Sequence, residues 1–317
     1  MSLSVGIVGL PNSGKSTLFN ALLKRQIAQV AEYPFTTIEP NKGVVEVPDK
    51  RLEKIAQIVK PEKIVPSAME FIDIAGLVKG AHQGEGLGNA FLGHIREVDA
   101  ILHVVRFFDH IKSLNTGEYL AGKVSHVMGS IHPSRDIEVV NEELQLGGIR
   151  KPTLYLVNLD EKLLGDRVTQ DKLRQELKFK MKIENVIFAC VKLEMEVTQL
   201  PEEEQNDYLV GMGIKESGLD QVIRESYRLL DLITFFTIKG GKQVQAWPLK
   251  QGKTGFEAAG EVHTDMARGF IKAEVVSFDD LAASGSWGKA HELGKIRLEG
   301  KDYQVRDGDV IEFKFQV

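Results

Sequence analysis

The string GLPNSGKS at residues 9–16 constrains the fold of this chain more strongly than any other stretch. It follows an apolar segment at residues 4–8 and precedes residues 17–23, whose apolar side chains share one side of a helix. A strand, a glycine-rich turn and a helix start form the setting in which G-x-x-x-x-G-K-[ST] becomes a phosphate site. Gly9 and Gly14 allow a tight turn whose N–H groups, with the helix dipole, point at an anion. The sequence therefore predicts a P-loop that binds a nucleotide.

Two side chains of this loop have specific expected roles. Lys15 can reach the β- and γ-phosphates, and the Ser16 hydroxyl can ligate Mg²⁺. The residues expected to bind the nucleotide through the loop and the first helical turn are Asn12, Ser13, Gly14, Lys15, Ser16 and Thr17.

A second strand is predicted at residues 70–73, and it ends at the carboxylate of Asp73. In a P-loop protein this strand end is where a Mg²⁺-bound water needs a ligand, and Gly76 can give its N–H to the γ-phosphate. The proline-flanked loop after the first helix offers the remaining Mg²⁺ ligand. We favour Thr37 over its neighbour Thr36, in a loop that can order when the γ-phosphate is present.

The residue after Gly76 bears on hydrolysis. Ras-like enzymes place a water-orienting Gln there, whereas this chain has Leu77. An aliphatic side chain cannot orient water by hydrogen bonding, so hydrolysis must use another group. The glycine-rich residues 77–89 predict a mobile segment suited to sensing the nucleotide.

Apolar runs predict the remaining strands of a first domain. They lie at residues 44–47, 100–106, 153–157 and 186–189, and helices, including those at residues 49–59 and 136–144, lie between them. Alternation of this kind indicates an α/β domain with a mostly parallel sheet and helices on both faces.

The chain changes character near residue 234. A helix is predicted from residue 216 to residue 233, with Ser217 as its cap. Beyond it glycines recur, and residues 310–317 alternate at period two. We therefore expect a P-loop NTPase domain over residues 1–233 and a second, β-rich domain over residues 234–317.

Composition excludes several classes of protein. With 317 residues, 43% of them hydrophobic, the chain can bury the cores of two domains. A formal net charge of −5 gives no general attraction for nucleic acid. The single cysteine, Cys190, excludes an intramolecular disulfide and fits a reducing compartment. Because the chain shows no basic–apolar leader and no apolar run near the ~18 residues that span a bilayer, we expect a cytoplasmic protein without membrane contact.

The base-reading segment departs from the guanine pattern. GTPases carry N-K-x-D, whose Asp accepts from the guanine N1–H and 2-amino group, but residues 158–161 read NLDE. Adenine offers neither donor, so a site without that matched acid loses its guanine advantage. Asn158 can still meet the purine edge and Leu159 can pack on its face, with Cys190 and Val191 approaching from the next strand end. The side chains of this segment favour ATP, and they leave open a GTPase whose guanine-recognition motif is degraded.

Together these strings resemble the Obg-like ATPases of the YchF subfamily, in the translation-factor class of P-loop GTPases. The matching strings are GIVGLPNSGKSTLFNAL, YPFTTIEPNKGVV, FIDIAGLVKGAHQGEGLGN, HIREVDAILHVVR, DIEVVNEELQL, NLDE, GEVHTDMARGFIKAEV and EGKDYQVRDGDVIEFKF. The resemblance implies a Mg²⁺-dependent, ATP-preferring NTPase with a hydrophobic residue in place of the catalytic Gln. It also implies that residues 234–317 form a TGS domain, a small β-grasp fold. The expected partner of the monomer is the ribosome, as the large subunit or the whole 70S or 80S particle.

The resemblance also implies a catalytic histidine in the loop beyond the third strand. The family pattern H-V-x-G-x-V-x-P falls on residues 126–133, which makes His126 the candidate. A neutral imidazole can position or deprotonate water. Asn12 resembles the P-loop Asn that helps to hold a monovalent cation, such as K⁺, in related proteins.

Two departures from the family pattern stand out. Family members carry a long helical coiled-coil insertion between the helix ending near Leu146 and the strand starting near Thr153, whereas only residues 147–152 intervene here. Either the protein lacks this arm or the sequence omits it. In addition, residues 111–124 form a longer connection ahead of His126 than is usual in the family.

We therefore expect an ATPase that forms ADP and phosphate, with residual GTPase activity open, and that regulates translation or the stress response. The alternative is a nucleotide-gated module that binds a ribosomal or protein partner and hydrolyses only incidentally. A basic stretch of the second domain could meet rRNA phosphate, although interspersed basic residues are also typical of a solvated face. Its members are Lys289, Lys295, Arg297, Lys301 and Arg306.

Overall fold

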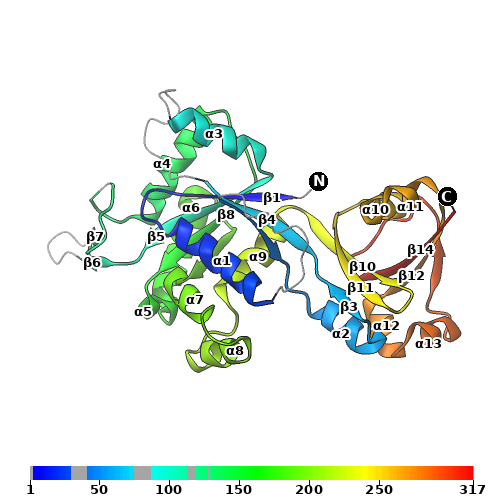
Figure 1. The fold of residues 1–317 in the computed structure, drawn as a ribbon. Helices are drawn as coiled ribbons and strands as arrows, with labels where there is room; N and C mark the ends of the chain where they lie inside the picture. Colours follow the sequence, from blue (N-terminus) through cyan, green and yellow to red (C-terminus); the bar gives the residue numbers. More distant parts are fainter. Residues whose placement is uncertain (1–2, 30–40, 75–86, 113–118, 128, 317) are drawn as a thin grey trace. The chain divides into compact units, whose positions relative to one another are not determined.

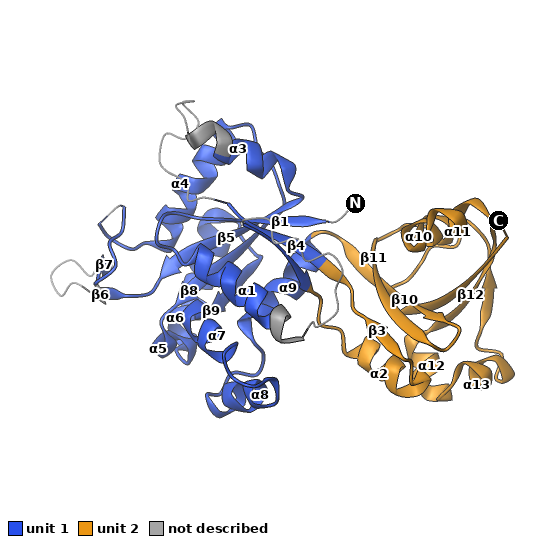
Figure 2. Ribbon diagram, viewed as in Figure 1, with its two compact units in different colours: residues 1–45, 69–229 blue, residues 46–68, 230–317 orange. Residues whose placement is uncertain are grey.

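The structure is a computed structural model, and it describes residues 3–29, 41–74, 87–112, 119–127 and 129–316. The chain forms two compact units (Figure 2). The first comprises residues 1–45 and 69–229, and the second comprises residues 46–68 and 230–317. None of the helices in the described part of the chain is long and apolar enough to cross a membrane.

The first unit is built on a six-stranded sheet (Figure 1). In spatial order its strands are β2 (Lys42–Glu46), β4 (Ala68–Asp73), β1 (Ser4–Val8), β5 (Ala100–Phe107), β8 (Thr153–Leu159) and β9 (Val186–Ala189). The five strands from β4 to β9 pair in parallel. The carboxyl ends of these parallel strands therefore meet at one edge of the sheet, as the sequence predicts.

Helices cover both faces of this sheet, which confirms the predicted α/β architecture. Side chains from β5 and β8 such as Val105 and Val157 form a buried cluster with residues of α4 and α6. The alternate residues, such as Val104 and Leu156, are fully buried on the opposite face. The helices of the unit are α1 (Lys15–Gln29), α3 (Leu87–Glu97), α4 (Pro133–Leu146), α5 (Glu161–Leu164), α6 (Arg167–Met181), α7 (Val191–Val197), α8 (Glu202–Gly211) and α9 (Gly218–Leu229).

The structure differs from two of the secondary-structure predictions. The helix predicted to reach residue 233 ends at Leu229, because Asp231 adopts a left-handed conformation with φ of 49° and strand β10 begins at Leu232. The segment between β5 and α4, which the sequence left as a loop, contains an antiparallel hairpin of β6 (His110–Lys112) and β7 (Tyr119–Ala121). The hairpin pairs His110 with Ala121 and Lys112 with Tyr119.

The connection between α4 and β8, where the resemblance expects a coiled-coil arm, is short and well bonded. The N–H of Ile149 donates to Leu144 O at 2.8 Å, and Gly148 takes the left-handed conformation that closes the helix end. The Ile149 side chain is buried in the cluster beneath α3 and α4. Residues 147–152 therefore join helix to strand directly.

The second unit is built on a mixed six-stranded sheet. In spatial order its strands are β13 (Arg297–Glu299), β12 (Phe270–Ser277), β14 (Asp309–Phe315), β10 (Leu232–Lys239), β11 (Gln243–Lys250) and β3 (Lys63–Val65). Helices α10 (Gly255–Val262) and α11 (Thr264–Arg268) contribute to one buried cluster of the unit, and α2 (Lys50–Val59), α12 (Phe278–Ser284) and α13 (Trp287–Glu292) contribute to the other.

Residues 46–68 complete this second unit although they lie early in the chain. Strand β3 pairs in parallel with β11 at the edge of the sheet, and Ile55 of α2 is fully buried beside Phe236 and Val310. Arg51 of α2 forms an ion pair with Asp307 at 2.7 Å. The sequence predicted a helix here but placed it in the first domain.

We predict that Ile55→Ala destabilises the second unit selectively. Truncating a fully buried isoleucine costs about 2–5 kcal/mol of unfolding free energy, whereas Lys54→Ala, at an exposed neighbouring position, stays within about 0.5 kcal/mol of wild type. Hydrogen exchange in the full-length protein measures this as lost protection in β10, β12 and β14. Lost protection confined to β1 and β5 would show that α2 stabilises the first unit instead.

Candidate functional site

The P-loop lies between β1 and α1 and depends on its two flanking glycines. Gly14 has φ of 101°, and a Cβ there would collide with the Nδ2 atom of Asn158. A Cβ on Gly9, with φ of 154°, would collide with the carbonyl oxygen of Val104. Only glycine satisfies both the left-handed backbone and the lack of space at these positions.

Lys15 lies across its own loop. Its ammonium donates to the carbonyl oxygen of Leu10 at 2.9 Å, and the residue is buried. Burial lowers the pKa of Lys15, while the nearby carboxylate of Asp73 acts in the opposite direction. A desolvated ammonium held by one neutral acceptor is well placed to exchange that acceptor for phosphate oxygens.

The predicted Mg²⁺ ligands that the structure describes come from neighbouring elements. Ser16 is exposed in the first turn of α1, and Asp73 ends β4, where it pairs in register with Ile7 of β1. Thr17, predicted to bind the nucleotide, is exposed in the same turn of α1. In the described part of the chain no three His, Cys, Asp or Glu side chains form a metal cage. Thr37 and Gly76, predicted to complete this site, lie outside the described residues.

Asn158, predicted to meet the purine edge, joins the two sides of the nucleotide site. Its Nδ2 donates to the carbonyl oxygen of Ser13 at 3.0 Å, and its Oδ1 accepts from the Val191 N–H at 3.0 Å. Cys190, just before Val191, is buried at the start of α7, and burial raises the pKa of its thiol. The side chain of Leu159 is 1% exposed and lies in the hydrophobic core.

The two carboxylates that follow Asn158 both have protein partners. Asp160 accepts from the backbone N–H of Asp109 at 3.0 Å. Glu161, at the position of the guanine-reading Asp, is exposed and accepts from Lys192 at 3.4 Å. The contact of Asp160 gave no signal in the sequence, because the two residues are 51 positions apart.

His126, the predicted catalytic residue, is buried against α4. Its Nε2 lies 3.0 Å from Oδ2 of Asp136, and its side chain is 1% exposed. Burial raises the pKa of Asp136, and the adjacent His126 opposes that shift. The second carboxylate oxygen of Asp136 is buried and has no hydrogen-bond partner among the described residues. The pair has the composition of a general base and its orienting acid.

The residue before His126 connects this loop to the P-loop. The carbonyl oxygen of Ser125 accepts from Asn12 Nδ2 at 3.3 Å and from Arg106 Nη1 at 2.9 Å. Arg106 is the penultimate residue of β5, and its side chain is 1% exposed. Sequence reasoning missed Arg106 and Asp136. A fully buried arginine at a strand end, visible as an arginine inside the apolar run of residues 100–107, was the available signal.

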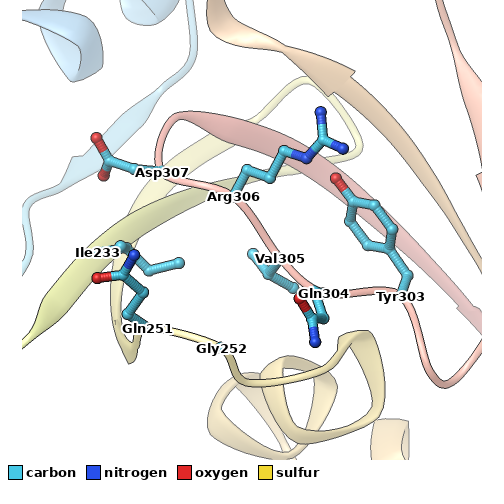
Figure 3. Close-up of a pocket in the computed structure, with 8 residues that line it drawn as sticks. All are labelled: Ile233, Gln251, Gly252, Tyr303, Gln304, Val305, Arg306 and Asp307. Atoms are coloured by element: carbon cyan, nitrogen blue, oxygen red, sulfur yellow. The ribbon is translucent and has the colours of Figure 1, made fainter.

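The second unit has a pocket of its own, shown in Figure 3. Its residues are Ile233, Gln251, Gly252, Tyr303, Gln304, Val305, Arg306 and Asp307. The Tyr303 hydroxyl donates to Asp309 at 2.7 Å, and Asp307 accepts from Arg51 and from the Thr234 N–H, so two of the polar side chains that line the pocket are engaged within the protein. No residue predicted to bind nucleotide lines this pocket, which leaves the P-loop edge of the first unit as the candidate site.

The parallel sheet, the glycine-bounded loop and the strand-end Asp73 define a P-loop nucleoside triphosphatase with the GTPase fold. Residues 4–158 match the family model MMR_HSR1, described as 50S ribosome-binding GTPase. Residues 232–316 match the family YchF-GTPase_C, described as a protein of unknown function (DUF933).

The chain is similar over its full length to curated relatives. It is 43% identical to the "Ribosome-binding ATPase YchF" of Bacillus subtilis and 40% identical to that of Escherichia coli O157:H7, with 100% of each chain covered. The structure of the Schizosaccharomyces pombe YchF GTPase matches with a TM-score of 0.80 at 29% identity, covering 99% of this chain and 98% of that one. This chain belongs to the YchF family.

The relatives contain residues without a counterpart here. The two alignments run over 368 and 378 positions, more than the 317 residues of this chain. The short bonded connection at residues 147–152 agrees with a chain that lacks a segment its relatives have.

We predict that Gly14→Ala weakens ATP binding at least about tenfold, since a left-handed non-glycine residue costs roughly 1–2 kcal/mol even before the collision with Asn158. Titration calorimetry with ATP and Mg²⁺ measures the loss. Gly93→Ala, in the interior of α3 with open space around it, is the matched control and leaves binding unchanged. Wild-type affinity in Gly14→Ala would contradict the described loop geometry.

Proposed function

We propose that this chain binds ATP with Mg²⁺, hydrolyses it to ADP and phosphate, and associates with ribosomes. The names of its full-length bacterial relatives support both the ATPase activity and the ribosome association. Because the proposed partner is the ribosome, we place the protein in the cytoplasm. We also propose that the C-terminal unit is a TGS domain. The names of the matching family and of the S. pombe structure read GTPase, so the preferred base has to be argued from the site.

The observation that carries the preference for ATP is the engagement of the NLDE segment. Guanine recognition needs a carboxylate aimed at N1–H and the 2-amino group. Asp160 gives its carboxylate to the Asp109 N–H, and Glu161 pairs with Lys192 at the surface. The lysine that would cover a guanine ring is replaced by Leu159, which is buried in the core. Adenine, which lacks those two donors, therefore loses no hydrogen bond at such a site.

The phosphate chemistry is assigned to the residues at the sheet edge. Lys15 and the loop N–H groups stabilise the phosphates, and Gly76 N–H is assigned to the γ-phosphate. Ser16, Thr37 and Asp73 would hold Mg²⁺, which neutralises charge that develops on the phosphate oxygens.

His126 is proposed to position or deprotonate the attacking water, because Leu77 cannot. Ser125 keeps the histidine next to Asn12 of the P-loop, and Asp136 orients its ring. Since the ring is 1% exposed, it has to turn outward to reach a water beside the γ-phosphate.

Asn12 is proposed to hold a monovalent cation such as K⁺ beside the phosphates. Its Nδ2 donates to Ser125 O, which turns the carboxamide oxygen, the atom a cation needs, away from that contact.

Ribosome association is supported by the names of the relatives more than by a basic surface. Of the five predicted rRNA-contacting residues, Lys295 pairs with Asp280 at 3.1 Å, Arg297 donates to Tyr303, and Lys301 lies over the Phe256 ring. Partial neutralisation of this kind reduces attraction for phosphate.

We predict that the protein binds ATP at least about tenfold more tightly than GTP, a difference of roughly 1.4 kcal/mol. Parallel titrations of both nucleotides into the full-length protein measure this, with and without EDTA to remove Mg²⁺. Loss of the divalent ion weakens both affinities. Tighter binding of GTP would sink the assignment of the base and identify a GTPase with a degraded reader.

We also predict that His126→Ala lowers kcat about 100-fold, within the range of a general base, and leaves ATP affinity unchanged. The control is His132→Ala in the same loop, which keeps wild-type turnover because the His132 side chain makes no cap hydrogen bond to α4. Steady-state phosphate release and nucleotide titration measure the two quantities. Undiminished turnover in His126→Ala contradicts its catalytic role. If a variant without turnover still co-sediments with ribosomes in an ATP-dependent manner, the result favours the binding-module alternative.

A further inference from the structure

The end of strand β8 sends side chains to two different loops of the site. Asn158 reaches Ser13 of the P-loop, and Asp160, two residues on, reaches the N–H of Asp109 at 3.0 Å. Leu159 between them is buried in the core. Because alternate residues of an extended chain share a side, a single strand end serves both loops.

The carboxylate of Asp160 is used differently from that of an ordinary helix cap. Asp160 stands at the N-cap position of α5 with extended backbone angles, where an aspartate usually accepts from an N–H of the first turn. No such cap bond forms, and the carboxylate binds the Asp109 N–H instead. A local stabilisation is given up for a contact 51 residues away.

Asp109 closes the stem of the loop that carries His126. It adopts a left-handed conformation with φ of 50°. Its carboxylate accepts from the Val124 N–H at 2.6 Å, and its carbonyl accepts from the Gly122 N–H at 2.8 Å. A Cβ on Gly122 would collide with the Asp109 carboxylate, so this closure needs glycine at position 122.

Arg106 extends the stem to the P-loop. Its Nη2 donates to Val124 O and its Nη1 to Ser125 O, both at 2.9 Å, and Ser125 O also accepts from Asn12. Beyond this fixed point, Gly129 has φ of 73° with open space around it. The stem is therefore anchored through the carbonyl groups of Val124 and Ser125.

We propose that Asp160 is a positioning residue for hydrolysis: it fixes the Asp109 turn, and thereby holds the His126 loop against the P-loop. It takes no part in reading the base. This inference rests on the proposed function of His126. Without the carboxylate the stem gains freedom, and His126 is less often within reach of the γ-phosphate. Misplacement by about 1 Å can cost as much as about 100-fold in rate.

The test compares three variants of the full-length protein in steady-state ATP hydrolysis. Asp160→Ala lowers kcat about tenfold, a partial loss of positioning, with KM and ATP affinity unchanged. Asp160→Asn retains most of the turnover, because its carboxamide oxygen still accepts from Asp109 N–H. Asp166→Ala is the matched control: Asp166 is also an N-cap aspartate, but it caps its own helix through Thr169 N–H at 3.1 Å. That variant loses thermal stability and keeps wild-type kcat.

A further variant, Gly122→Ala, changes the same turn from the side opposite Asp160. Gly122→Ala displaces the Asp109 carboxylate and lowers kcat as Asp160→Ala does, and the double variant loses no more than the worse single one. If Asp160→Ala does not fold, Gly122→Ala decides the question. In a His126→Ala background neither change lowers the residual rate further.

Three results overturn the proposal. The first is an unchanged kcat in a folded Asp160→Ala or Gly122→Ala variant. The second is an Asp160→Ala variant that binds ATP more weakly at constant kcat, because that result would make Asp160 a base-reading residue. An Asp160→Asn variant as slow as Asp160→Ala also contradicts it. The proposed function fails separately, when His126→Ala itself keeps wild-type turnover.

Discussion

The nucleotide site depends on the side-chain amide of Asn158. A P-loop turns its N–H groups toward the phosphates, so carbonyl groups such as that of Ser13 face the protein and need donors there. Asn158 supplies that donor and at the same time accepts from Val191 N–H. Removing it leaves a buried carbonyl and a buried N–H unpaired, at about 1–3 kcal/mol each. Because Gly14 packs against the same amide, the phosphate loop, strand β8 and the start of α7 hold their positions together.

Parallel strands extend this dependence across the sheet. Strands β1, β4, β5 and β8 end at one edge, and each end delivers a different group: the P-loop, Asp73, Arg106 and Asn158. The chemistry of the site therefore needs few local specialisations, since the sheet brings together residues from four distant stretches. The loop with His126 is the exception, because it extends far from its strand and relies on Arg106 and Asp109 to return beside Asn12.

Features with a local pattern could be predicted from the sequence, and features set by distant contacts could not. The P-loop, the strands and the position of Asn158 follow from motifs and periodicity. The partners of Asp160 and Ser125 are separated by 51 and 113 residues and leave no periodic signal. Helix α2 shows the same limit: the sequence predicted a helix there but not which of two cores would bury Ile55. The left-handed Asp231 likewise ends α9 without a proline or glycine to announce it.

The composition of the second unit from residues 46–68 and 230–317 has a consequence for how the chain is made. During synthesis, α2 and β3 emerge early, yet the strands that receive them are translated last. The apolar side of α2, with Leu52 and Ile55, must remain uncovered or be shielded by a chaperone through the synthesis of the intervening first unit. Such long-range closure slows folding. The nascent chain therefore passes through a stage in which its first unit can be complete while the second still lacks most of its sheet.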